Sequence, residues 1–226
     1  MRFGVLFSGG KDSTYAVYTA MKTDKVVCLI SILSENKESY MFHTPNVKLT
    51  ELQAEAMGFP LIQETTRGEE EKELTELRKA IKKAKEKFDI EGVVSGAVES
   101  VYQATRIQKI CDELGLWCFN PLWKRDQKVL LKEMVKNQFK FIISGFFAHP
   151  FDISWLGKKV DVKCVKSLLE FSEKHKISPT GEGGEIETFV LDCPIFNKKI
   201  KILDFDISTD KRSGVFIIKN ASLVKK

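Results

Sequence analysis

Short apolar segments alternate along this chain with segments of helical spacing, and this alternation constrains the fold more than any other feature. Residues 2–7 (RFGVLF) form a continuous apolar run, which is typical of a strand buried on both faces. Residues 12–22 follow with the apolar spacing of a helix, and residues 25–33 form the next apolar run. A strand, a helix and a second strand therefore fill the first 33 residues, an order that favours parallel pairing.

The same alternation continues to about residue 125. Further strands are predicted at residues 61–66 and 90–98, a strand and turn at 116–123, and further helices at residues 44–60, 69–88 and 100–115. We therefore predict an α/β fold in which a doubly wound, mostly parallel sheet carries helices on both faces.

The pattern changes after about residue 125, where we place a soft boundary without an obvious linker. Helices are predicted at residues 126–139 and 160–177, and strands at 140–148, within 181–196, and in the alternating tail 198–224. The sequence thus predicts a domain at residues 1–125 and a smaller C-terminal α+β lobe at residues 126–226.

Composition limits the classes of protein to which this chain can belong. Its 226 residues are 43% hydrophobic, enough for one large domain or for one domain with a smaller lobe. The formal net charge of +5 permits a phosphate-bearing partner without requiring one. Five cysteines without a CxxC pair argue against a disulfide framework and a zinc knuckle. Because neither a signal peptide nor an apolar run of ~20 residues is present, we expect a cytoplasmic protein without a membrane partner.

The glycine-rich segment at residues 8–13 (SGGKDS) stands between the first predicted strand and its helix. A glycine pair there lets the backbone turn tightly and brings bare N–H groups against a ligand, and the helix N-terminus attracts anions. Two serine hydroxyls, a lysine and an aspartate complete a cradle for phosphates. Its residues are Ser8, Gly9, Gly10, Lys11, Asp12 and Ser13, of which Asp12 can cap the helix or help to hold a metal ion.

Two better-known phosphate motifs do not fit this segment. In a Walker A loop the lysine would occupy the position of Gly10, and the spacing G-x-G-x-x-G is absent as well. A simple turn before a capped helix remains the structural alternative.

A second group of candidate residues follows the strand at 90–98. Its small residues lie at the carboxyl edge of the sheet, where a nucleotide can approach closely: Ser95, Gly96 and Ala97. Four polar residues then share one helix face, which we expect to line a cleft: Glu99, Tyr102, Gln103 and Arg106. An ordinary surface ion pair is the alternative for Arg106.

A loop rich in glycine and glutamate forms the third group. Its residues are Glu182, Gly183, Gly184, Glu185, Glu187 and Thr188. Like charges this close repel one another unless a cation lies among them, so the loop can hold Mg²⁺, attract a cationic substrate, or accept a proton. We favour the substrate-side roles, because a metal beside the phosphates can use Asp12. A solvated hairpin tip is the alternative. His43 is a candidate substrate contact, although loop histidines are more often structural.

Several of these segments resemble known families. The segment SGGKDS resembles the PP-loop of the N-type ATP pyrophosphatases, whose members cleave ATP between the α- and β-phosphates and have a HUP-like fold. Residues 95–123 and 181–196, together with residues 42–46 (FHTPN), resemble the diphthine–ammonia ligase family.

This resemblance implies a specific reaction. The protein would adenylylate the carboxylate of diphthine, a modified histidine on translation elongation factor 2, and amidate it with ammonium to give diphthamide. ATP and Mg²⁺ are the implied cofactors, and no stable nucleic-acid partner is expected. The catalytic residues would be Lys11, Asp12, Glu185 and Glu187, and the substrate contacts would be His43, Glu99, Tyr102, Gln103, Arg106, Glu182, Gly183, Gly184 and Thr188.

Two other functions remain open at the level of the sequence. A tRNA-modifying enzyme, acting by thiolation or amidation, can use the same loop, but the missing CxxC and the lack of an RNA-binding appendage count against it. A non-catalytic nucleotide sensor would have no need for the glutamate-rich loop, which supplies a second reactant site.

Overall fold

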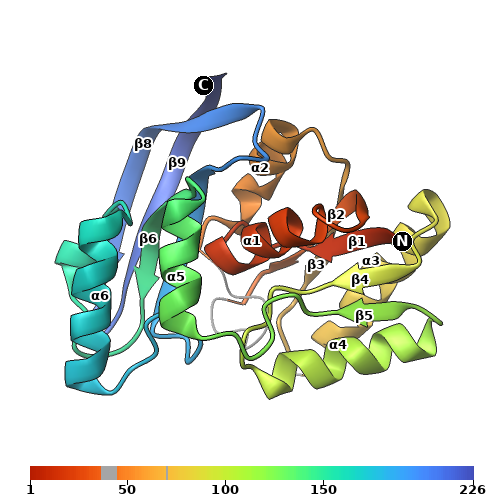
Figure 1. Ribbon diagram of the computed structural model, residues 1–226, viewed down its shortest axis with the longest axis horizontal. Coiled ribbons are helices and arrows are strands. Elements are labelled where there is room, and N and C mark those ends of the chain that lie inside the picture. The colour runs from red at the N-terminus through yellow and green to blue at the C-terminus, as the bar shows by residue number, and fades with distance from the viewer. Residues whose placement is uncertain (37–44, 70) are drawn as a thin grey trace.

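A computed structural model describes residues 1–36, 45–69 and 71–226 of the chain. The chain forms two sheets, one of five strands and one of four (Figure 1). The predicted element types match the observed ones along most of the described sequence.

The first sheet is built entirely of parallel pairs. Its strands lie in the order β3-β2-β1-β4-β5. Their bounds are β1 (Arg2–Leu6), β2 (Lys25–Ser34), β3 (Leu61–Thr66), β4 (Gly92–Val94) and β5 (Trp117–Phe119). The prediction of a parallel α/β sheet is therefore confirmed.

Helices cover both faces of this sheet. On one face, helices α1 (Lys11–Ala20) and α2 (Thr50–Met57) pack in an apolar cluster that contains Val5 of β1. On the other face, α3 (Glu73–Phe88) and α4 (Val101–Glu113) pack in a second cluster with residues of β2 such as Ile30. The sheet is doubly wound, as its near-continuous apolar strands predict.

The strand order reverses between β1 and β4. The chain proceeds from β1 outward to β3, returns, and then adds β4 and β5 on the other side of β1. In open α/β sheets, ligands bind outside the carboxyl ends of the strands at such a switch point. The segment that follows β1 is the glycine-rich segment 8–13, so the topology brings it to this crevice.

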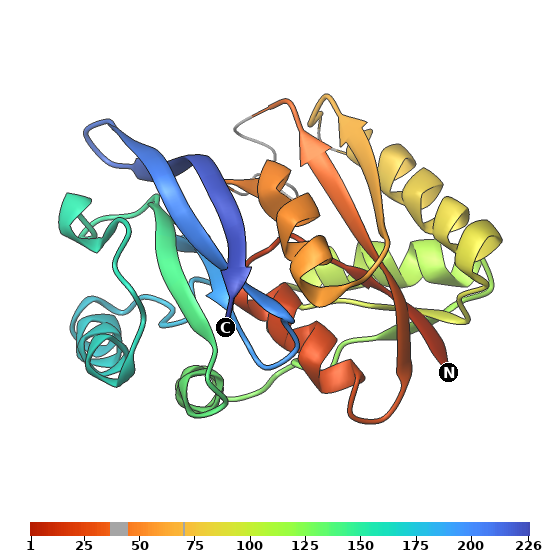
Figure 2. The same ribbon diagram turned by 90° about the horizontal axis from the view of Figure 1, so that it is seen from above.

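The second sheet is antiparallel. Its strands lie in the order β7-β6-β9-β8, with bounds β6 (Lys140–Phe146), β7 (Ile186–Asp192), β8 (Lys198–Thr209) and β9 (Gly214–Lys225). Helices α5 (Gln127–Lys136) and α6 (Val162–His175) run side by side along this part of the chain (Figures 1 and 2).

The two sheets share a core. One apolar cluster contains Val5 of β1, Phe141 of β6 and Phe189 of β7, all nearly inaccessible to solvent. We keep the division near residue 125 as a proposal, since it follows the change from parallel to antiparallel pairing rather than a gap in the packing.

Several boundaries differ from the sequence-based prediction. The helix predicted at 44–60 is a 3₁₀ turn, η1 (Val47–Leu49), followed by α2, which ends at Gly58 with a φ of 77°. Ser100 is the N-cap of α4, so Glu99 precedes that helix instead of lying on it. A second 3₁₀ turn, η2 (Ile153–Trp155), was not predicted. Over the described ranges, no helix combines the length and the apolar character needed to cross a membrane.

Candidate functional site

The turn after β1 has the geometry that its glycines predict. Gly9 has a φ of 81°, a conformation in which a side chain would be strained, and a Cβ there would lie 2.2 Å from Oε1 of Gln53. Gln53 is fully buried, and its Nε2 donates to the carbonyl oxygens of Gly9 (2.9 Å) and Val190 (2.8 Å). A side chain of α2 therefore fixes the turn and links it to β7.

The two serines of the segment lie on either side of the glycines. The Oγ atoms of Ser8 and Ser13 are 3.2 Å apart, and Ser13 Oγ also accepts from the backbone nitrogen of Ser8. Gly10 is the N-cap residue of α1 and, because it has no side chain, it does not cap the helix with a side-chain hydrogen bond. Backbone and hydroxyl donors thus gather at the positive end of α1, where anions bind.

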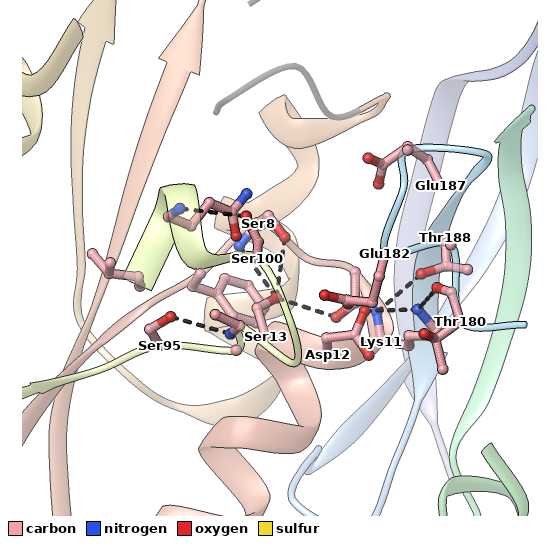
Figure 3. Close-up of a pocket in the computed structure, with 18 of the residues that line it drawn as sticks. Ser8, Lys11, Asp12, Ser13, Ser95, Ser100, Thr180, Glu182, Glu187 and Thr188 are labelled. Atoms are coloured by element: carbon pink, nitrogen blue, oxygen red, sulfur yellow. Dashed lines mark hydrogen bonds and ion pairs between the residues drawn. The ribbon is translucent and has the colours of Figure 1, made fainter. Parts of the chain in front are cut away.

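Lys11 connects this segment with the glutamate-rich loop. Its side chain is only 3% exposed, and its Nζ lies 2.7 Å from Oδ2 of Asp12 and donates to the carbonyl oxygen of Thr180 (Figure 3). Its backbone nitrogen donates to Oγ1 of Thr188 over 3.1 Å. Residues almost 180 positions apart in the sequence are therefore in direct contact.

The turn after β4 forms the other wall. Ser95 Oγ accepts from the backbone nitrogen of Ala97 at 3.1 Å, and Ser95 is nearly buried. At Gly96 a Cβ atom would meet the backbone of Asp12 and Ser13 at 2.8–2.9 Å. Only glycine allows this turn to approach the first turn of α1 so closely.

These segments enclose a cavity of about 600 Å³. Most of the predicted site residues line it: Ser8, Gly10, Lys11, Asp12, Ser13, Ser95, Gly96, Ala97, Gln103, Glu182, Gly183, Gly184, Glu187 and Thr188. Apolar residues line it as well: Leu6, Phe7, Ile30, Ile32, Val47, Ile107, Phe147 and Ile186. The cavity therefore has both a polar lining, rich in donors and acids, and an apolar lining.

The glutamate-rich loop begins with a tight turn. The backbone nitrogen of Gly184 donates to the carbonyl of Gly181, and both glycines have a φ of 80°. Glu185 closes this loop on itself, because its carboxylate accepts from the backbone nitrogens of Ser178 (3.1 Å) and Gly183 (2.9 Å). Glu185 does not line the cavity.

The remaining two glutamates of the loop do line the cavity. The pKa of Glu187 is raised to about 7, mainly by burial; Lys11 opposes this rise, and Asp12 and Glu182 contribute to it. Burial and the nearby Asp12 also raise the pKa of Glu182, whose Oε2 accepts from the backbone nitrogen of Glu99 at 3.0 Å. A carboxyl group with a pKa near 7 is suited to exchange protons at neutral pH.

The helix face predicted to line the cleft does so only at Gln103. Arg106 stacks on the ring of Tyr102, with its Cζ 3.4 Å from the ring centroid, and pairs with the carboxylate of Glu71. This is the surface ion pair named above as the alternative. Glu99 lies before the helix, and its Oε2 accepts from Nε2 of Gln127 at 2.9 Å. These three side chains lie outside the cavity lining.

Some residues of the site have no counterpart in the sequence-based prediction. They are Gln53, Ser100, Gln127, Phe147, Ser178 and Thr180. Among these residues, the sequence gives a signal only for Gln53, which falls on the apolar side of a short helix. His43 and most of the segment 42–46 lie outside the described residues.

Comparisons with known proteins show which family this sequence resembles. The family profile described as "Diphthamide synthase N-terminal domain" matches residues 1–118, and that described as "Diphthamide synthase C-terminal domain" matches residues 126–224. A diphthine–ammonia ligase from Bos taurus is 36% identical over 229 residues, covering 92% of this chain and 85% of that protein. The Mus musculus ligase is 38% identical over 222 residues, covering 89% of this chain and 83% of that protein.

One solved structure is similar at a much lower level. It is a predicted subunit of a tRNA methyltransferase from Methanocaldococcus jannaschii, with a TM-score of 0.42 and 19% identity, over 86% of this chain and 98% of that chain. A likeness this distant supports no argument about function.

Proposed function

The chain belongs to the diphthamide synthase family of ATP-dependent diphthine–ammonia ligases, and from this premise we propose that one cavity holds ATP, the diphthine carboxylate and ammonia. The observation that carries the proposal is the contact of Lys11 with both Asp12 and Thr180. It joins the anion-binding turn to the acidic loop, so two reactants bound at these two elements would be neighbours.

ATP solves a specific chemical problem in this reaction. A carboxylate repels a nucleophile and has no good leaving group at neutral pH. Attack of a carboxylate oxygen on the α-phosphorus forms an acyl-adenylate and releases pyrophosphate. Ammonia then adds to the acyl carbon, the bond to AMP breaks, and the nitrogen loses a proton as the amide forms.

The pyrophosphate end of ATP is assigned to the glycine-rich turn. The N-terminus of α1, the hydroxyls of Ser8 and Ser13, and Lys11 supply donors and positive charge there. Positive charge at the departing pyrophosphate stabilises the transition state electrostatically. The nucleoside end is assigned to the apolar lining near Ile30, Ile32 and Ile107, beside the turn formed by Ser95, Gly96 and Ala97.

Asp12 fits a Mg²⁺ ligand. Its Oδ1 is buried and has no hydrogen-bond partner within the described part of the chain. The described residues hold no cluster of three or more His, Cys, Asp or Glu that would bind a metal alone. Mg²⁺ is typically held by one or two carboxylates together with substrate phosphates, so a single aspartate beside a phosphate site suffices. Mg²⁺ bound to ATP would neutralise phosphate charge.

The acids of the cavity divide between two tasks in this proposal. Glu187, with its raised pKa, accepts the proton that the attacking nitrogen loses. Glu182 provides negative charge that attracts ammonium and the quaternary ammonium of diphthine. Glu185, predicted from the sequence to be catalytic, instead holds the loop in shape through its bonds to Ser178 and Gly183. Oγ1 of Thr188 accepts a hydrogen bond from the backbone nitrogen of Lys11, and this bond aligns β7 with the start of α1.

The proposed partners are translation elongation factor 2 bearing diphthine, and ammonium. A stable nucleic-acid complex is not part of the proposal, and the cytoplasmic location stays a prediction.

A direct assay tests this function. The protein is incubated with ATP, Mg²⁺, ammonium and elongation factor 2 carrying diphthine, and nucleotides and the mass of the factor are measured. We expect AMP and pyrophosphate in a one-to-one ratio with amide formed on the factor, and none without the factor. Production of ADP, release that depends on tRNA and a sulfur donor, or binding of ATP without turnover would each contradict the proposal.

A further inference from the structure

Gln127 occupies a position between the two halves of the site. It is the first residue of α5, outside the cavity lining, and its side chain is half-buried. Its Oε1 accepts from Ser178 Oγ and from Thr180 Oγ1, both at 2.7 Å. Its Nε2 donates to Oε2 of Glu99 at 2.9 Å. Both ends of the amide are therefore used, one as an acceptor and the other as a donor.

These bonds belong to a closed ring. Gln127 donates to the Glu99 carboxylate, and the backbone nitrogen of Glu99 donates to the Glu182 carboxylate. The backbone nitrogen of Glu182 donates to Ser178 Oγ at 2.9 Å, and that hydroxyl donates back to Gln127. The ring joins three chain segments: the turn after β4, the start of α5, and the loop before β7.

Together, the ring and the hydrogen bond from Thr180 Oγ1 to Gln127 hold two groups of the site. One is the carboxylate of Glu182, which lines the cavity. The other is the carbonyl of Thr180, which accepts from Lys11. Neither group has a rigid element of its own, since both lie in the loop between α6 and β7. Gln127 lies on helix α5, so its hydrogen bonds to Ser178 and Thr180 anchor this loop to a regular element.

We propose that Gln127 is a positioning residue for the ligase reaction, and that it sets the place of Glu182 and of the Thr180 carbonyl relative to the nucleotide. This inference rests on the proposed function of the cavity. Gln127 acts through the polarity of its amide, because a donor must face Glu99 while an acceptor faces the two hydroxyls. A misplacement of a reacting group by about 1 Å can lower a rate on the order of 100-fold.

Exchanging the glutamine at position 127 with the glutamate at position 99 tests the required polarity of the Gln127 amide. Gln127→Glu places a carboxylate against the carboxylate of Glu99, while it keeps the acceptor for Ser178 and Thr180. Adding Glu99→Gln restores a donor–acceptor pair with its direction reversed and returns the net charge to that of the wild type. Gln108→Glu makes the same change at an exposed hydrogen bond outside the cavity lining, where Gln108 Nε2 donates to Oδ1 of Asp112 at 2.8 Å, and serves as the matched control. Gln127→Leu removes both ends of the amide at similar size.

The measurement is the rate of AMP release that depends on elongation factor 2, with kcat and KM for ATP determined separately. We expect Gln127→Glu and Gln127→Leu to lower kcat about 10- to 100-fold and to change KM for ATP less than about threefold. The double exchange should recover most of kcat, and the control should stay within about threefold of the wild type. Amide hydrogen exchange at residues 178–185 should be faster in Gln127→Leu and restored in the double exchange.

Two results would overturn the inference. One is a kcat for Gln127→Glu within twofold of the wild type, and the other is a double exchange as slow as the single variant. If Gln127→Glu does not fold, Gln127→Leu and the double exchange still decide the question. Failure of the wild type to form AMP would count against the proposed function, while the hydrogen-exchange comparison would still report on the ring.

Discussion

A Cβ atom on Gly96 would lie 2.8 Å from the backbone nitrogen of Ser13. The carbonyl carbon of Asp12 and the Cα of Ser13 are almost as close, at 2.9 Å, and backbone cannot move aside as a flexible side chain can. The turn after β4 and the first turn of α1 are therefore packed at the closest approach that glycine permits. This contact brings together the two walls of the cavity to which we assign the nucleoside and the phosphates of ATP.

We expect Gly96→Ala to separate these walls and to weaken ATP binding at least tenfold. This factor corresponds to a loss of about 1.4 kcal/mol of binding free energy. Calorimetric titration with ATP and Mg²⁺ measures the effect. Gly115→Ala is the matched control. Gly115 has a φ of 61°, so an alanine there is strained, but its nearest neighbour would be Lys85 Nζ at 3.9 Å, and the residue does not line the cavity. This control should lose stability and keep its ATP affinity. Equal ATP affinities for Gly96→Ala and the wild type would contradict the packing argument.

We expect Lys11 and Arg106, the two cationic site residues predicted from the sequence, to differ strongly in their effect on the rate of adenylylation. Lys11 is buried among acids at the cavity, whereas Arg106 pairs with a half-exposed Glu71 outside it. Lys11→Met is expected to lower the rate of adenylylation 10²- to 10³-fold, the usual cost of removing one donor from a charged transition state. Arg106→Met removes the same charge but should change that rate less than about threefold, because exposed ion pairs contribute only ~0–1 kcal/mol.

Exchange of labelled pyrophosphate into ATP, in the presence of elongation factor 2 carrying diphthine and without ammonium, isolates the adenylylation step. Circular dichroism confirms that both variants are folded. Equal losses in the two variants would show that positive charge on the whole protein matters, and not the position of Lys11.

The sequence predicted the glycine-rich turn after β1 because its cause is local. Two glycines, two serines and a helix start fall within six residues, and the parallel pairing of the strands follows from the alternation of strands and helices. Ser95, Gly96 and Ala97 could be assigned for the same reason, since the end of a buried strand lies at the edge of the sheet.

The parts that the sequence did not predict depend on contacts between distant segments. Helical spacing placed Glu99, Tyr102 and Arg106 on one face, but the helix begins one residue after Ser100, and the cavity touches it only at Gln103 among the four candidates. The acids of the 182–187 loop look equivalent in the sequence. Only the folded loop distinguishes Glu185, whose carboxylate accepts from the backbone nitrogens of Gly183 and Ser178, from Glu187, which lines the cavity.

Glu187 should make both stability and activity depend on pH. Burial raises its pKa from the ordinary 4.5 to about 7, so between these values the native state binds a proton that the unfolded state has released. The free energy of unfolding should therefore fall as pH rises from 4.5 to 7 and then level off. The loss should be on the order of 2 kcal/mol, because one pKa unit corresponds to ~1.4 kcal/mol and cavity water screens part of the effect.

Glu187→Gln replaces the titrating carboxyl group with a neutral amide. The variant should therefore be more stable than the wild type at pH 8, while the two proteins should have similar free energies of unfolding at pH 4. Urea unfolding at several pH values measures the difference. In the wild type, amide formation should rise as pH increases through about 7, when the concentration of free ammonia is held constant, because only the ionised Glu187 accepts a proton. In Glu187→Gln the rise should vanish and the rate should stay low, although exchange of pyrophosphate into ATP continues. Unfolding curves of the two proteins that stay parallel from pH 4 to pH 8 would show that this carboxyl group titrates normally, and its role as proton acceptor would then fail.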